Sequence, residues 1–134
     1  MKEKKKFFFL KTRFRSFTFA LAGLRHTWKT QVNLRIQAGV AVCALGAGWW
    51  LGVSPLGLAG ITLAAFAVIS AEIFNSAIEA ILDMISPFRS PQAGRIKDMA
   101  AAAVLAAALG AFLTGLFILG PPLWARLSPL SSGF

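Results

Sequence analysis

Three long stretches that lack charged residues constrain this chain more than any other feature. Residues 36–53 and 54–71 are each 18 residues long, and residues 99–125 form a run of 27. About 20 apolar residues in a helix span the hydrocarbon core of a bilayer, and slightly shorter runs suffice when polar ends reach the interface. A soluble bundle with buried helices fits these run lengths poorly. The runs therefore predict an all-α integral membrane protein with three transmembrane helices.

The composition agrees with this interpretation. The chain has 134 residues, enough for one domain, and 57% of them are hydrophobic while only 14% are charged. Its mean hydropathy is +0.68, which is high for a soluble domain. The single cysteine, Cys43, lies inside the first apolar run and has no partner for an intramolecular disulfide.

The basic residues are distributed unequally around the apolar runs. Ten of the fourteen Lys and Arg residues lie in residues 2–35, three lie between the second and third runs, and only Arg126 follows the third. Basic residues mark the cytoplasmic side of a membrane protein. We therefore expect a cytosolic N-terminus, a cytosolic 84–98 loop and an external C-terminus. The net charge of +9 is best matched by an anionic lipid surface, because no nucleic-acid-binding module is recognisable.

The N-terminal region divides into two parts. Residues 1–11 are rich in lysine and are predicted to be a disordered tail that touches lipid headgroups. Residues 12–29 are predicted to form an amphipathic helix on the membrane surface, because apolar residues recur at a spacing of three or four beside a basic face. The apolar positions are Phe14, Phe17, Leu21, Leu24 and Trp28. No secretory signal precedes them.

We expect one membrane domain over residues 1–134, with helical spans at 36–53, 56–85 and 96–120. Gly120-Pro121-Pro122 should end or kink the third span, and residues 125–134 should form a loose polar tail. Small residues recur every fourth position in the first and third spans, which permits close helix contact. These two seams are Gly39, Cys43 and Ala47, and Ala102, Ala106, Gly110 and Thr114.

Four of the five carboxylates lie within residues 71–98: Glu72, Glu79, Asp83 and Asp98. At about 100° per residue, the first three share an arc of roughly 100° with Asn75 and Ser76 on one side of a helix. Glu72 lies at the edge of the apolar run, where a carboxylate that faced lipid would be costly. We therefore expect it to face protein, and we expect neighbouring subunits to complete the site.

This acidic stripe, followed by Lys97-Asp98, suits a site for a magnesium nucleotide. Mg²⁺ binds one or two carboxylates together with phosphate oxygens, and a lysine can stabilise charge on a transferring phosphoryl group. A further glutamate could accept the proton of an attacking hydroxyl. A proton-coupled transporter would also place acids in a membrane helix, although transport acids should line a central path.

Two motifs resemble a known family. The run from Glu72 through Asn75 and Glu79 to Asp83, followed by Lys97-Asp98, is similar to the prokaryotic diacylglycerol kinase family, which includes undecaprenol kinases. The resemblance covers about residues 14–120. It implies a homotrimer of three-span protomers with a surface helix, located in the bacterial cytoplasmic (inner) membrane. It also implies sites shared between subunits, ATP and Mg²⁺ as requirements, and a membrane lipid alcohol as substrate.

The resemblance also implies roles for individual residues. Glu72 matches the catalytic base, Glu79 a ligand of the metal and nucleotide, and Lys97 and Asp98 match nucleotide contacts. Phe19, Phe88, Arg89 and Ser90 match further nucleotide-binding positions, and Asn75 and Asp83 match supporting polar residues. Gln31 stands where the family often has a second metal-binding glutamate, so it offers a carbonyl oxygen without a charge.

The sequence leaves three alternatives to the first choice of function open. The first choice is phosphorylation of diacylglycerol to phosphatidic acid, and the alternative is phosphorylation of undecaprenol to undecaprenyl phosphate. The undecaprenol branch is favoured by Asn33-Leu34-Arg35-Ile36 and Ser86-Pro87, whereas residues 94–99 favour the diacylglycerol branch. An inactive assembly subunit, suggested by Gln31, and a small proton-coupled transporter are the further alternatives.

Overall fold

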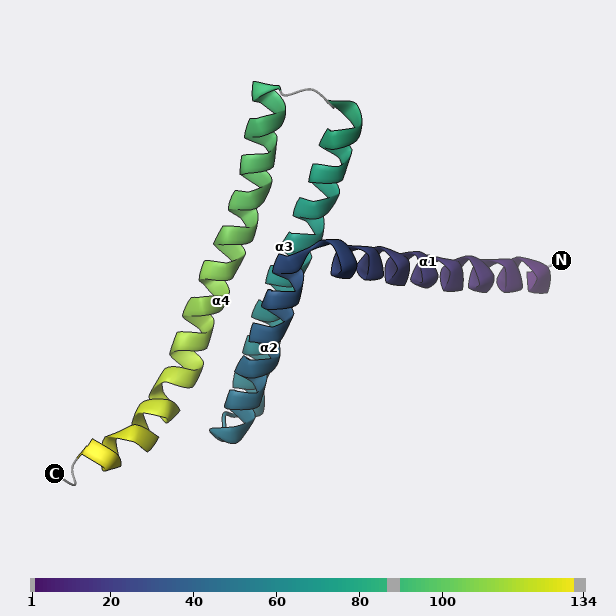
Figure 1. The fold of residues 1–134 in the computed structure, drawn as a ribbon. Coiled ribbons are helices and arrows are strands. Elements are labelled where there is room, and N and C mark those ends of the chain that lie inside the picture. Colours follow the sequence, from purple (N-terminus) through teal and green to yellow (C-terminus); the bar gives the residue numbers. More distant parts are fainter. Residues whose placement is uncertain (1, 87–89, 132–134) are drawn as a thin grey trace. The chain divides into compact units, whose positions relative to one another are not determined.

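The computed structural model describes residues 2–86 and 90–131, with side chains for residues 15–86 and 90–128. It contains four helices: α1 (Lys2–Thr30), α2 (Val32–Trp50), α3 (Pro55–Ile85) and α4 (Pro91–Ser131) (Figure 1). Every regular element in the described part of the chain is helical, as the sequence predicts. The chain forms two compact units, Met1–Val32 and Asn33–Phe134.

The first unit is the single 29-residue helix α1. The prediction of a disordered tail over residues 1–11 was wrong, because the helix begins at Lys2. Lysine is a good helix former, and neither Gly nor Pro interrupts this segment. Towards its C-terminal end, α1 leaves large apolar side chains open: Phe17 is 71% exposed and Leu21 is 65% exposed.

A tight turn connects α2 to α3 within the second unit. Gly52 has a φ of +73°, the left-handed conformation that glycine adopts without a Cβ clash. The Val53 amide donates to the Gly48 carbonyl and the Gly52 amide donates to the Trp49 carbonyl, which is the Schellman pattern of a helix end. Ser54 then caps α3 by accepting from the Gly57 amide at 3.2 Å, and Pro55 occupies the first helical position.

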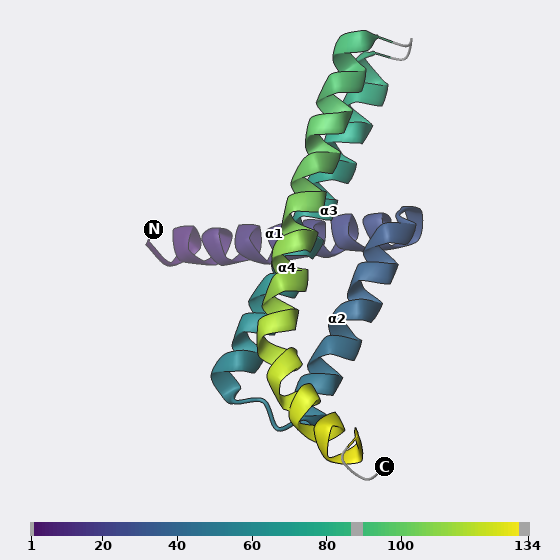
Figure 2. The same ribbon diagram turned by 90° about the vertical axis from the view of Figure 1, so that its left-hand side faces the viewer.

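Helices α3 and α4 lie side by side and run in opposite directions (Figures 1 and 2). Glycines on α3 allow a close approach at one end of this pair, because a Cβ on Gly57 would lie 3.2 Å from Ile118 Cγ2. Helix α2 meets the pair at its own C-terminal end, where a Cβ on Gly48 would lie 2.9 Å from Leu58 Cδ2 and 3.5 Å from Leu119 Cδ2. Within one protomer, these glycines lie at close contacts between the helices. Gly39 and Gly110, one from each predicted seam, have no such neighbour within 4 Å.

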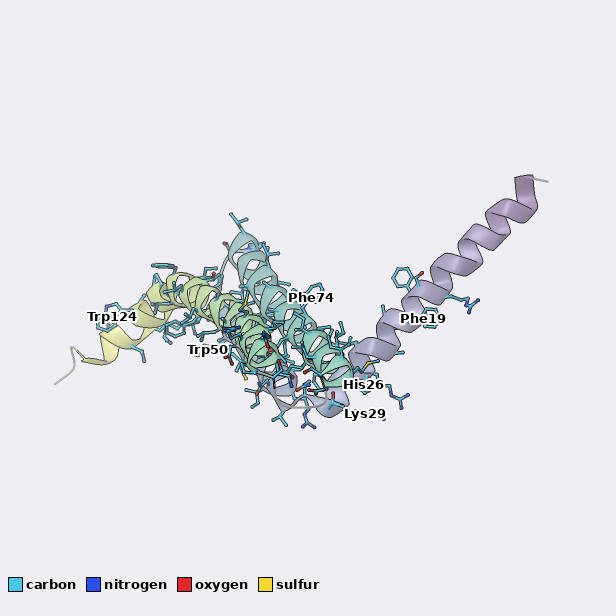
Figure 3. All side chains as sticks on the ribbon, turned by 90° about the horizontal axis from the view of Figure 1, so that it is seen from above. Phe19, His26, Lys29, Trp50, Phe74 and Trp124 are labelled. Carbon is cyan, nitrogen blue, oxygen red and sulfur yellow. The ribbon has the colours of Figure 1, made fainter. Side chains whose placement is uncertain are left out.

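Arg126 on α4 contacts the C-terminal end of α2. Its Nη2 donates to the Trp50 carbonyl at 3.1 Å, and its guanidinium lies 4.5 Å from the centre of the Trp50 ring. A cation suits this position, because the last carbonyls of a helix carry partial negative charge. Trp50 and Trp124 remain 62% and 74% exposed, as is common for tryptophans at a membrane interface (Figure 3).

Helix α4 is longer than the sequence suggests. Of the two expectations for Gly120-Pro121-Pro122, an end or a kink, the end was wrong, since α4 continues through both prolines. The expected loose tail from residue 125 was also wrong for the residues as far as Ser131. Proline removes one backbone hydrogen bond and clashes with the preceding turn, so a helix that continues through it bends. Figure 1 shows such a bend towards the yellow end of α4. Residues 132–134 of the expected tail lie outside the described residues.

Two helices in the described part of the chain are long and apolar enough to cross a membrane: α3 and the stretch Pro91–Ser128 of α4. None of the most apolar 18-residue window of α4 is buried, and only 17% of that of α3 is. A helix that is apolar on all sides must lie in a protein core or in lipid, and here little protein covers it. Helix α2 has 19 residues, about 28 Å, but begins with the polar residues Asn33, Arg35 and Gln37.

Candidate active site

Polarity on α3 is reversed relative to a water-soluble helix. Glu72 is only 2% exposed, whereas Phe74, two residues later, is 70% exposed. Ile81 on the apolar side is 56% exposed. Figure 3 labels Phe74 among the side chains of this unit. A carboxylate turned inward and a phenyl ring turned outward indicate that the surroundings of this helix are apolar.

The buried Glu72 is held by a residue from another helix. Gln37 on α2 donates from Nε2 to Glu72 Oε2 at 3.0 Å, across 35 positions of sequence. A carboxylate can only accept a hydrogen bond, so this contact determines which end of the amide faces Glu72. The other end, Gln37 Oε1, is buried without a hydrogen-bond partner.

The second glutamate of the stripe lies two turns further along α3. Asn75 donates from Nδ2 to Glu79 Oε1 at 3.1 Å, and Asn75 Oδ1 is buried without a partner. Glu79 is half-buried. The Ser76 hydroxyl donates to the Glu72 backbone carbonyl at 2.8 Å, so it is engaged within its own helix. Asn75 therefore contacts Glu79, and its role as a supporting polar residue of the site stays a prediction.

A salt bridge joins α3 to α4 at the polar end of the stripe. Lys97 Nζ lies 2.6 Å from Asp83 Oδ1, and the two side chains are 40% and 69% exposed. Asp83 lies eleven residues from Glu72, so the Lys97 ammonium is about 16 Å further along α3 than the buried base candidate. The lysine is closer in register to Glu79, four residues from Asp83. An exposed pair of this kind contributes little to stability, because solvent screens the two charges.

The remaining predicted site residues are spread over the chain. Asp98 is exposed on α4, and Ser90 caps that helix by accepting from the Ala93 amide at 3.4 Å. Phe88 and Arg89 lie outside the described residues. Phe19 and Gln31 belong to the unit Met1–Val32. There Phe19 is 66% exposed, with the Arg15 guanidinium 5.9 Å from its ring centre.

The oxygen atoms around Glu79 fit magnesium better than a softer metal. No group of three His, Cys, Asp or Glu side chains among the described residues could hold a metal by itself. Glu79 and the unpartnered Asn75 Oδ1 are both hard oxygen donors on one helix face. Mg²⁺ takes few protein ligands and completes its shell with phosphate oxygens and water, so these residues fit a metal that arrives with a nucleotide.

Gln37 is the residue that sequence reasoning missed. In the part of α2 that follows Arg35, Gln37 is the only side chain with an amide group, and the residues around it are mostly apolar. A lone polar side chain in a membrane helix needs a partner, and this signal could have identified it. Its partner could not have been identified, because spacing along one helix says nothing about contacts with the next.

A carboxylate buried among apolar helices, with a second carboxylate and a lysine towards their polar ends, defines a membrane protein with a polar site at one end of its helices. The chain belongs to the prokaryotic diacylglycerol kinase family, whose model matches residues 18–119. It is therefore a membrane lipid kinase of that family, in agreement with the resemblance noted in the sequence.

Curated relatives support this family and include two substrates in their names. The diacylglycerol kinase of Escherichia coli (strain K12) is 37% identical over 102 residues, covering 75% of this chain and 83% of the relative. The diacylglycerol kinase of Synechocystis sp. is 34% identical over 81% of this chain, although the match spans only 62% of that relative. The undecaprenol kinase of Bacillus subtilis (strain 168) is 34% identical over 82% of this chain and 89% of its own length.

Proposed function

We propose that this protein transfers the γ-phosphoryl group of ATP to the hydroxyl of diacylglycerol, producing phosphatidic acid at the cytosolic face of the bacterial inner membrane. The observation that carries this proposal is Glu72, a carboxylate that is 2% exposed yet lies on an apolar helix. Such a group is costly in a membrane, so its presence there indicates a function. The family and the names of the relatives favour a lipid hydroxyl as its target.

In the proposed reaction Glu72 is the general base. Its carboxylate removes the proton of the lipid hydroxyl, whose oxygen forms a bond to the γ-phosphorus while the bond to the bridging β–γ oxygen breaks and ADP leaves. The lipid reaches Glu72 from the bilayer, and the nucleotide lies towards the polar end of the stripe. Burial excludes water, which would otherwise compete for the phosphoryl group.

Glu79 is proposed to bind the metal–nucleotide, with Asn75 fixing its carboxylate through the 3.1 Å hydrogen bond. Gln31 is proposed as a second, uncharged metal contact. When bound, Mg²⁺ would neutralise the phosphate oxygens and hold the transferring group in line. Lys97 and Asp98 are proposed as nucleotide contacts, together with Phe19, Phe88, Arg89 and Ser90.

The proposed assembly is a homotrimer of three-span protomers with a cytosolic N-terminus and α1 on the membrane surface. Thirteen of the fourteen basic residues then lie on the cytosolic side. The offset of about 16 Å between Lys97 and Glu72 along α3 supports sites that draw residues from two subunits. The open apolar side chains of α1 are compatible with a surface helix.

Undecaprenol is the second candidate substrate, favoured by the Bacillus subtilis relative. The test is phosphoryl transfer from radiolabelled ATP by purified protein in mixed micelles, with each alcohol offered separately. We expect labelled phosphatidic acid from diacylglycerol and a much lower rate with undecaprenol. A higher kcat/KM with undecaprenol would reverse the choice of substrate, and no labelled product with either alcohol would contradict the proposed activity.

A further inference from the structure

The Gln37 side chain forms a contact that none of the proposed catalytic roles uses. It extends from α2, on a different helix from the acidic stripe, and its Nε2 is 3.0 Å from Glu72 Oε2. Its Oε1 is buried and has no hydrogen-bond partner. We propose that Gln37 is a positioning residue for the base, and that its amide serves both protonation states of Glu72. This inference rests on the proposed role of Glu72.

A positioning contact is needed because the glutamate side chain is flexible. The terminal torsion of glutamate has a broad, roughly two-fold distribution, so packing alone defines it weakly. A base must hold its oxygen within hydrogen-bond reach of the hydroxyl that it deprotonates. The Gln37 amide restrains one carboxylate oxygen and leaves the other to the substrate. A hydrogen bond to a charged group is also stronger than one between neutral groups.

The unpartnered Oε1 of Gln37 suggests the second half of the proposal. Before the reaction Glu72 is an anion that can accept but not donate, so the amide nitrogen is the end it needs. After it has taken the substrate proton, Glu72 is a neutral acid with an O–H group that requires an acceptor. The carbonyl oxygen of the same amide supplies one. The Gln37 amide can therefore donate to one oxygen of the acid and accept from the other.

Neither a lysine nor an apolar residue could do both. A lysine would pair with the anion but could not accept a hydrogen bond from the acid. An apolar side chain would leave the buried carboxyl without a partner in either state, which is costly inside a membrane. The length of the side chain also matters, because Gln37 must extend from α2 to Glu72 on α3. Gln37 also lines an apolar groove of about 470 Å³ together with Val40.

The test uses Gln37→Met, which keeps the length and apolar volume of the side chain but removes both hydrogen-bonding atoms. We expect kcat to fall about 10- to 100-fold, as for the loss of a hydrogen bond to a charged group and a misplaced base. The KM values for ATP and for the lipid should stay within about two-fold. Val40→Ala is the matched control, because Val40 lines the same groove three residues further along α2 and its apolar side chain cannot form a hydrogen bond with Glu72. It should retain the parental kcat.

A double-mutant cycle separates positioning from a general loss of structure. If Gln37 acts through Glu72, Gln37→Met should not lower the residual rate any further in a Glu72→Gln background. An additional loss there would overturn the inference. If Glu72→Gln itself retains full activity, the proposed base is wrong. If Glu72→Gln is inactive but Gln37→Met has the parental kcat, the base is right and the positioning role is wrong.

Infrared difference spectra test the second half of the proposal with a readout that does not depend on enzyme activity. At acidic pH the carboxyl band of protonated Glu72 is identified by its loss in Glu72→Gln. We expect this band to shift in Gln37→Met and to stay in place in Val40→Ala. An unchanged band in Gln37→Met would show that the amide does not accept from the acid form.

Discussion

The two glutamates of α3 differ in surroundings more than in chemistry. They are seven residues apart, which places them about 10 Å apart along the helix axis. Mg²⁺ holds its ligands at about 2.1 Å, so a single ion cannot bind both carboxylates directly. Glu72 is buried and accepts a hydrogen bond from Gln37, whereas Glu79 is half-buried and accepts a hydrogen bond from Asn75. This difference favours the deep residue as base and the outer residue as metal ligand.

Substitution of each glutamate should separate these roles. Glu72→Gln should lower kcat by about 10²- to 10⁴-fold, the usual effect of losing a general base, while ATP affinity stays nearly constant. Glu79→Gln should weaken binding of Mg-ATP, and a higher Mg²⁺ concentration should restore part of it. Nucleotide calorimetry beside initial rates measures both effects. Loss of ATP binding in Glu72→Gln with retention in Glu79→Gln would reverse the assignment.

The uncharged Gln31 leads to a second prediction about a single residue. Gln31→Glu adds a carboxylate at a proposed metal contact, so Mg-ATP should bind more tightly because Mg²⁺ prefers charged oxygen ligands. The KM for the lipid should not change. Titration of the rate with Mg²⁺, and calorimetry of Mg-ATP binding, measure the change. Unaltered Mg²⁺ dependence would argue that Gln31 is not at the metal.

At the scale of elements, glycines determine how closely α3 approaches its neighbours. A Cβ on Gly57 would lie 2.5 Å from Val53 Cγ1 and 3.2 Å from Ile118 Cγ2, and one on Gly60 would lie 3.2 Å from Ile118 Cδ1. Valine has a stiff, β-branched side chain that cannot rotate away easily. The turn after α2 and the packing of α3 on α4 therefore depend on the same glycine.

Gly57→Ala should destabilise the protein by about 1–3 kcal/mol, the usual cost of inserting a methyl group into a packed contact. Gly94→Ala is the control, because nothing lies within 4 Å of a Cβ at that position of α4. It should leave stability equal or slightly raised, since alanine favours a helix. Thermal unfolding in a fixed detergent compares the two. Equal midpoints would mean that the contact at Gly57 relaxes without cost.

At the scale of the whole molecule, the charge asymmetry predicts the orientation in the bilayer. The site proposed above works only if the acidic stripe faces the compartment that contains ATP. A reporter fused after Phe134 should be external, and a reporter inserted in the 86–94 loop should be cytosolic. Alkaline phosphatase and green fluorescent protein fusions report the two sides. The reverse pattern would contradict both the orientation and the site.

The proposed sharing of sites between subunits can be tested by mixing two inactive variants. Glu72→Gln and Lys97→Ala each remove one part of the site. If the two residues of one site come from different subunits, mixed oligomers contain some intact sites and activity should partly return. Coexpression with two affinity tags and tandem purification isolates the mixed species. Mixed oligomers with no activity would indicate that each protomer holds a complete site.

The sequence alone determined the helical class, the acidic stripe and the family. These features depend on local properties: runs without charge, the 100° step of a helix and the order of residues within a motif. It also identified Glu72 as a group that should face protein, and its exposure of 2% confirms this. The ends of the helices were predicted less well, because α1 begins at Lys2, within the segment expected to be disordered, and α4 continues past Pro121 and Pro122.

Only the tertiary structure decided which residues meet. The hydrogen bond between Gln37 and Glu72, the salt bridge between Asp83 and Lys97, and the contact of Arg126 with Trp50 all join different helices. The close contacts of α3 occur at Gly57 and Gly60, and the predicted seams have no such contacts at Gly39 or Gly110. Periodicity places a residue on one face of its own helix. It does not place the neighbouring helix, because that depends on how all the side chains between the two helices pack.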